Sequence, residues 1–123
     1  MKIKIFFSII LTLSIFIVSC SQKGSCEQLS KQFETYDKAV EKIKLTVFKI
    51  EESVNTSKSS WIKNASYYSC DGQIGYFILE TSKKEYLHAD LPYQVWTEFK
   101  SAESFGSFYN ENIRDKYNLN LTK

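Results

Sequence analysis

The chain opens with an uncharged run of 14 residues, from Ile5 to Val18, which follows Lys2 and Lys4. A transmembrane helix needs about 20 apolar residues, so this run is too short to span a bilayer. Its length and its basic flank are typical of the central region of a signal peptide. We therefore expect residues 1–19 to be a cleaved export signal, which leaves residues 20–123 for one modest domain.

The run ends in Ile17-Val18-Ser19-Cys20. This ending resembles the lipobox of bacterial lipoproteins, in which a small residue precedes the cysteine that receives the lipid. The resemblance implies that Cys20 is lipidated and anchors the mature protein, with residues 20–25 as a tether, because two or three acyl chains hold a protein stably on a membrane. We expect a lipoprotein of the bacterial cell envelope that faces the periplasm. The alternative is an ordinary export signal with an incidental cysteine.

Loss of the signal also removes the excess of positive charge. The whole chain has 16 Lys+Arg and 14 Asp+Glu, and Lys2 and Lys4 belong to the signal, so 14 residues of each sign remain. Nucleic-acid-binding proteins neutralise phosphates with a surplus of Lys and Arg. The balanced charge therefore argues against nucleic acid as a partner.

Cys26 and Cys70 are the two cysteines that remain after Cys20. An exported protein meets an oxidising compartment, so we predict that they form a disulfide, which would close a loop of 45 residues. Two separate thiols, with Cys70 buried, are the alternative. We expect no metal and no cofactor, because one histidine and two cysteines cannot supply four zinc ligands.

The hydrophobic spacing predicts an α+β fold. Apolar residues recur every three or four positions over residues 27–44, which predicts an N-terminal helix, although the spacing can be extended to Val54. Residues 45–54 are β-branched and aromatic at their start, and we favour an extended segment for them. Residues 26–53 would thus precede the main domain, residues 54–123.

That main domain is predicted to begin with a small antiparallel meander of three to four strands. Asp71-Gly72 is a strong hairpin signal between residues 61–70 and the apolar run 74–81, and residues 85–89 would form the next strand. Pro92 fits the first turn of a helix, and a last helix would run from Phe105 to Tyr117. Both helices are expected to pack on one face of the sheet.

Residues from about Val54 to Tyr117 carry an ordered set of motifs. They are Ser59-Ser60-Trp61-Ile62, Glu85 to Pro92 (EYLHADLP), Val95-Trp96, Ala102-Glu103-Ser104-Phe105-Gly106 and Phe108-Tyr109-Asn110 followed by Ile113-Arg114 and Tyr117. This set resembles the KTSC domain, a short module at the C-terminus of some lysyl-tRNA synthetases that also occurs as a stand-alone bacterial protein. The resemblance implies a strand-strand-strand-helix-helix unit for which RNA binding has been suggested. The family's central Tyr-x-Tyr is Tyr86-Leu87-His88 here.

The candidate binding residues are the polar, aromatic and glycine positions of these motifs: Ser60, Tyr86, His88, Trp96, Ser104, Gly106, Tyr109 and Arg114. A hydrolase triad drawn from His88, Asp90 and a serine lacks a Gly-x-Ser-x-Gly elbow, and Glu51-Glu52 and Glu111/Asp115 are interpreted as solvated carboxylates. Arg114 is interpreted as a surface residue paired with Glu111, or as a clamp for a carboxylate.

These observations predict a non-catalytic binding module. Its partners would be the membrane, through the lipid, and an envelope protein or peptide. The sheet face, or the helix junction at Ser104-Phe105-Gly106, would form the binding surface. An RNA-binding KTSC module is the alternative.

Overall fold

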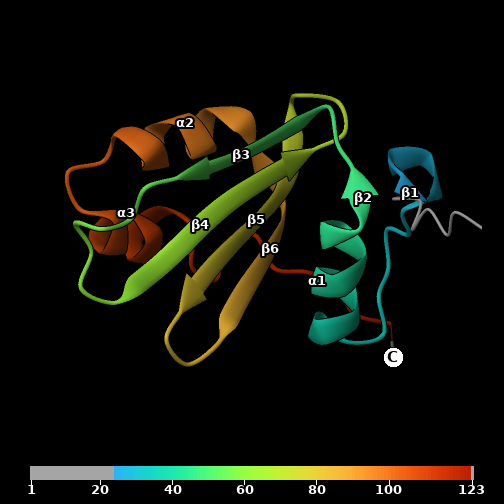
Figure 1. Ribbon diagram of the computed structural model, residues 1–123, viewed down its shortest axis with the longest axis horizontal. Helices are drawn as coiled ribbons and strands as arrows, with labels where there is room; N and C mark the ends of the chain where they lie inside the picture. The colour runs from blue at the N-terminus through green and yellow to red at the C-terminus, as the bar shows by residue number, and fades with distance from the viewer. Residues whose placement is uncertain (1–23, 123) are drawn as a thin grey trace, which may run out of the picture.

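A four-stranded antiparallel sheet lies at the centre of the computed structural model, which describes residues 24–122 (Figure 1). Its strands are β3 (Ile50–Val54), β4 (Ile62–Ser69), β5 (Ile74–Thr81) and β6 (Glu85–Pro92). Each strand pairs with the next one along the chain, in the order β3-β4-β5-β6. The predicted meander is therefore confirmed, and residues 45–54 contain strands rather than helix.

The β4–β5 connection shows why the sequence turns where it does. Gly72 has a φ of 79°, a conformation that side chains disfavour. The Asp71 carboxylate accepts hydrogen bonds from the backbone N–H groups of Gln73 (2.8 Å) and Ile74 (3.1 Å). The Asp-Gly pair thus forms the predicted turn, and these donors lower the pKa of Asp71.

Two helices cover one face of the sheet, as predicted: α2 (Tyr93–Ser101) and α3 (Phe105–Asn112). The core beneath them consists of buried residues from both helices and from the strands, namely Ile62, Ala65, Tyr67, Phe77, Leu79, Leu91, Trp96, Phe99, Phe105, Tyr109 and Ile113. Pro92 is the residue before α2 rather than part of its first turn. The last helix ends at Asn112 instead of reaching Tyr117, and the chain turns at Asp115, whose φ is 62°.

The opposite face is covered by the N-terminal part of the chain. Helix α1 (Tyr36–Lys44) packs there, after a 3-10 helix η1 (Cys26–Gln28) and a short parallel pair of β1 (Gly24–Ser25) with β2 (Thr46–Val47). This second core includes Phe33, Ala39, Ile43, Phe48, Ile78, Leu87 and Leu119.

The predicted N-terminal helix, residues 27–44, is correct only in its second half. Helix α1 begins at Tyr36 because Thr35 caps it, with the hydroxyl accepting from the backbone N–H of Lys38 at 3.2 Å. Phe33, which fits the helical spacing, instead lies in extended chain and pairs with Leu121.

The chain after α3 returns along the free edge of β6. The backbone carbonyl of Tyr117 accepts from the N–H of Ala89 at 3.1 Å, and the N–H of Thr122 donates to the carbonyl of Phe33 at 2.8 Å. This tail thus covers one exposed sheet edge, which would otherwise be a template for unwanted strand pairing.

Cys26 and Cys70 lie at disulfide distance, with Sγ atoms 2.12 Å and Cα atoms 5.8 Å apart, in agreement with the predicted pair. Cys70 is exposed, so the alternative of a buried thiol is wrong. Of the residues predicted as a tether, 20–25, Gly24 and Ser25 pair with β2. No helix within residues 24–122 is both long and apolar enough to cross a membrane, and Cys20 and residues 1–19 lie outside the described part.

Candidate functional site

The eight residues selected from the sequence lie in three places. Tyr86, His88, Tyr109 and Arg114 line one pocket; Ser60, Ser104 and Gly106 line a second, shallower hollow; and Trp96 is buried in the core between α2 and the sheet. The first group comes from β6, α3 and the turn after α3, and it is the largest set of candidates that the fold brings together. We call this site the His88 pocket.

His88 lies at the inner side of this pocket with both ring nitrogens engaged. Its Nδ1 is 3.2 Å from the carbonyl oxygen of Tyr117, and its Nε2 is 3.0 Å from the hydroxyl of Tyr109. A carbonyl can only accept, so Nδ1 carries the proton. In the neutral ring Nε2 then accepts from the Tyr109 hydroxyl.

Burial keeps both partners of this hydrogen bond uncharged. His88 is 6% exposed, and loss of solvation lowers its pKa below the usual 6.5. The same cause raises the pKa of Tyr109 to about 12. The neutral pair therefore forms a polar but uncharged floor for the pocket.

The hydrolase triad suggested by the sequence does not form. The two hydrogen bonds of His88 go to Tyr109 and Tyr117, and neither partner is a carboxylate or a serine. Asp90 is exposed and sits in a left-handed backbone conformation, with a φ of 56°, beside an irregularity in the β5–β6 pairing. His88 thus has neither the orienting acid nor the nucleophile that this chemistry needs.

Two cations, Lys84 and Arg114, line the pocket together with the acidic Glu85 and Asp115, and its volume is about 300 Å³. The Nζ atom of Lys84 lies 4.5 Å from the ring centroid of Tyr86 and, within residues 24–122, forms no ion pair. The exposed Arg114 has its Nε 4.0 Å from a carboxylate oxygen of Asp115 rather than near Glu111, so the predicted pairing with Glu111 is wrong. A surface contact of this length is weak and leaves the guanidinium free to bind an anion.

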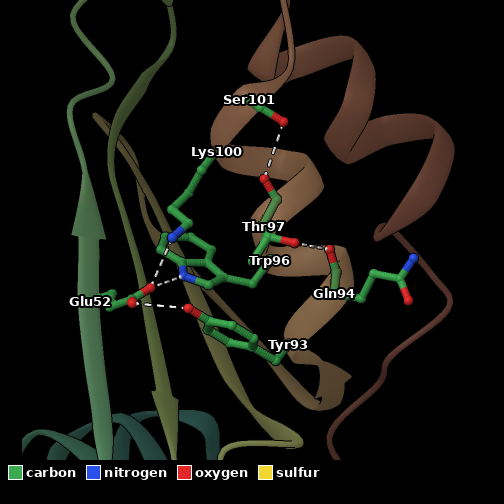
Figure 2. A network of polar contacts seen from close by, with 7 residues as sticks. All are labelled: Glu52, Tyr93, Gln94, Trp96, Thr97, Lys100 and Ser101. Atoms are coloured by element: carbon green, nitrogen blue, oxygen red, sulfur yellow. Dashed lines mark hydrogen bonds and ion pairs between the residues drawn. The ribbon is translucent and has the colours of Figure 1, made fainter.

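Trp96 belongs to a polar network at β3, which is the edge of the sheet opposite to β6 (Figure 2). The sequence analysis did not predict this network. The carboxylate of Glu52, on β3, accepts from Trp96 Nε1 at 2.7 Å, from Lys100 Nζ at 3.0 Å and from the Tyr93 hydroxyl at 3.2 Å. The hydrogen bond from Trp96, followed by that from Lys100, lowers the pKa of Glu52. Glu52 is therefore not a freely solvated carboxylate, and Trp96 is a structural residue.

The remaining candidates shape the start of α3. The hydroxyl of Ser104 accepts from the backbone N–H of Ser107 at 3.2 Å and caps the helix. Gly106 lies in the first turn of α3 rather than between two helices, and it faces the indole of Trp61. Ser60 is exposed beside them. Ser104 and Gly106 thus have clear structural roles.

A larger cavity of about 570 Å³ lies on the opposite face, where the disulfide, Tyr76, Asp90 and the tail residue Asn118 meet. No sequence motif marks it, because its walls come from the N-terminal segment, the sheet and the C-terminal tail. Its lining contains a single cation, Lys31, where that of the His88 pocket contains two. Within the part of the chain that the structure describes, no cluster of three or more metal-ligating side chains occurs.

Comparison with known proteins gives a family for the part of the chain that holds the His88 pocket. The model of the KTSC domain matches residues 58–117. No curated protein and no solved structure matches the chain. All eight candidate residues fall inside the match, whereas β3, α1 and the cysteine at position 26 lie outside it. The chain therefore carries a KTSC domain at residues 58–117.

Proposed function

We propose that this protein is a lipid-anchored binding module of a bacterial cell envelope, and that its KTSC domain holds the carboxylate of a peptide in the His88 pocket. The observation that supports this proposal is the pair of cations, Lys84 and Arg114, in the lining of a pocket whose buried His88 and Tyr109 are uncharged.

The charges around the pocket favour an anionic group. Glu85 is paired with Lys44 at 2.9 Å, which leaves Asp115 as the acidic group near Arg114. A guanidinium presents a planar fork of donors that matches a carboxylate, and an ammonium adds a second positive charge. The ring of Tyr86 offers an apolar wall for the rest of a terminal residue.

The buried histidine supports binding rather than catalysis. A general base must be able to take a proton from a substrate, but His88 already accepts from Tyr109 through Nε2. Burial also makes protonation unfavourable. The imidazole thus fixes the position of the Tyr109 ring and of the tail at Tyr117.

The lipid anchor is proposed on the sequence around Cys20. We expect metabolic labelling with a fatty-acid analogue to mark the wild type and not the Cys20→Ala variant. Cys26→Ser is the matched control, because it changes a cysteine outside the IVSC sequence and should stay labelled. A labelled Cys20→Ala protein would contradict the anchor.

The pocket is tested by titration with short peptides that differ only in a free or amidated C-terminus. Arg114→Gln and Lys84→Gln should each weaken binding of the free acid about tenfold, as expected for loss of one charge-assisted hydrogen bond. Lys83→Gln, the exposed neighbour that does not line the pocket, should bind as the wild type does.

Two results of this titration would count against the proposal. Equal affinity for acid and amide would show that no carboxylate is bound. Binding of single-stranded RNA with a steep salt dependence, in the absence of peptide binding, would favour the RNA-binding alternative.

A further inference from the structure

The described part of the chain begins only a few residues after the proposed lipid at Cys20. Gly24 is held in place because its N–H donates to the carbonyl of Leu45 at 2.8 Å and because Ser25 pairs with Val47. The link between Cys26 and Cys70 ties the same segment to the end of β4. Three residues lie between Cys20 and Gly24, so the two are four Cα–Cα steps apart, and an extended chain of that length spans at most about 14 Å.

The strand to which this segment is attached exposes its apolar side. Leu45 and Val47 are 55% and 57% exposed, the highest values among the exposed large hydrophobic residues of the described chain. They alternate with the buried Thr46 and Phe48, and the exposed Lys49 follows in the same alternation. Leu45 caps the end of α1, Val47 lies in β2 and Lys49 follows in a bend, so three exposed side chains stand close together along this stretch of chain, and we call them the stripe.

The order of this stripe fits a lipid surface. Leucine and valine gain free energy when they leave water for the boundary between headgroups and acyl chains. A lysine beside them can extend its ammonium to the lipid phosphates while its methylene groups stay in the apolar zone. Within residues 24–122, Lys49 forms no ion pair that would compete with such a contact.

We propose that the stripe of Leu45, Val47 and Lys49 rests on the bilayer and fixes the orientation of the domain on the membrane. The inference depends on the proposed lipid at Cys20, because that lipid brings Gly24, and with it Leu45 and Val47, to the membrane surface. Helix α3 then lies at the end of the molecule remote from the bilayer, since β1 and α3 are at opposite ends in Figure 1.

Fluorescence quenching in vesicles tests the contact directly. The full-length lipidated protein is reconstituted in phosphatidylethanolamine–phosphatidylglycerol vesicles, with and without lipids brominated near the top of the acyl chains. The Val47→Trp variant should lose a large part of its added fluorescence in the brominated vesicles. The control is Asn110→Trp, at an exposed site on α3. Its added tryptophan should not be quenched, so its loss of fluorescence should be no larger than that of the wild type, which contains Trp61 and Trp96.

A second variant examines the rest of the stripe. Adding Leu45→Asp to Val47→Trp should reduce the quenching, because a carboxylate opposes insertion next to anionic lipid. Circular dichroism verifies that each variant is folded, and flotation of the vesicles on a density gradient measures attachment separately.

The two readouts distinguish the inference from the proposed function. A protein that floats with the vesicles, but whose Val47→Trp variant is quenched no more than Asn110→Trp, has the anchor and not the contact, and this result would overturn the inference. A wild-type protein that does not float lacks the anchor itself, and the inference falls with it.

Discussion

The indole of Trp61 occupies the space that a side chain at position 106 would need. A Cβ atom built on Gly106 would lie 2.6 Å from Trp61 Nε1, far closer than real contacts allow. The glycine does not have the positive φ that Gly72 has, so the close approach of the ring is what requires it. The indole, in turn, packs edge-on against Tyr109, at a centroid distance of 6.1 Å.

Gly106→Ala should therefore destabilise the protein by about 1–3 kcal/mol, and Gly106→Val by more. The cost arises because the half-exposed Trp61 ring must move away from α3. Urea unfolding of a double-mutant cycle measures it: in a Trp61→Ala background Gly106→Ala should cost nothing, because the obstacle is gone. An equal cost in both backgrounds would mean that the backbone, not the ring, selects glycine.

The stability of the protein should fall as the pH drops below about 6.5. Burial lowers the pKa of His88 in the folded state, so between that value and 6.5 the unfolded chain binds the additional proton. The contribution of His88 to the free energy of unfolding is thus fully present above the pKa of the unfolded state, and it is lost as the pH falls toward the pKa of the folded state. Urea unfolding at a series of pH values measures the slope.

His88→Gln should remove most of this slope between pH 6.5 and the carboxylate range. Glu52 provides an internal reference, because its lowered pKa makes stability fall only when the pH goes below about 4.5. An unchanged slope in His88→Gln would assign the dependence to another group.

Reduction of the link between Cys26 and Cys70 should destabilise the protein by up to about 4 kcal/mol, the chain-entropy value for a 45-residue loop. The effect is checked by urea unfolding with and without a reducing agent. The double variant Cys26→Ser/Cys70→Ser should have the stability of the reduced wild type and no response to the reducing agent. Two reactive thiols in the unreduced protein would rule out the pairing.

Glu52→Ala should cost about 1–2 kcal/mol, whereas Glu51→Ala should change stability by less than about 0.5 kcal/mol. The two neighbours have the same charge, but Glu52 accepts three hydrogen bonds and Glu51 is exposed on the other side of β3. Thermal melting of both variants tests the difference. Equal losses would show that the network around Trp96 contributes little.

The sequence predicted best what depends on neighbouring residues. The Asp71-Gly72 turn and the placement of both C-terminal helices on one face follow from local chemistry and from hydrophobic spacing. Threonine is a common helix cap, so Thr35 could have marked the start of α1. Phe33 also fits the helical spacing, and it favoured a start that is too early.

Contacts between segments that are distant in the sequence could not be predicted from the sequence. Glu52 resembles Glu51 in sequence, and only the fold brings it to Trp96, 44 residues later. His88 was selected as a candidate, but its partners come from α3 and from the tail at Tyr117, whose return path begins at the turn of Asp115. The residues of the His88 pocket likewise belong to separate sequence motifs, and only the fold brings β6 and the end of α3 together.

The bond between Thr122 and Phe33 has a consequence for the timing of folding. It joins residues 89 positions apart, so the layer over Ile78 and Leu87 is finished only when residues 119–122 are available. During synthesis, the meander and its two C-terminal helices can form while the opposite face still lacks part of its cover. A nascent chain therefore displays part of an apolar sheet face until residues 119–122 are made, and a chain that stops after α3 should aggregate more readily than one that contains these residues.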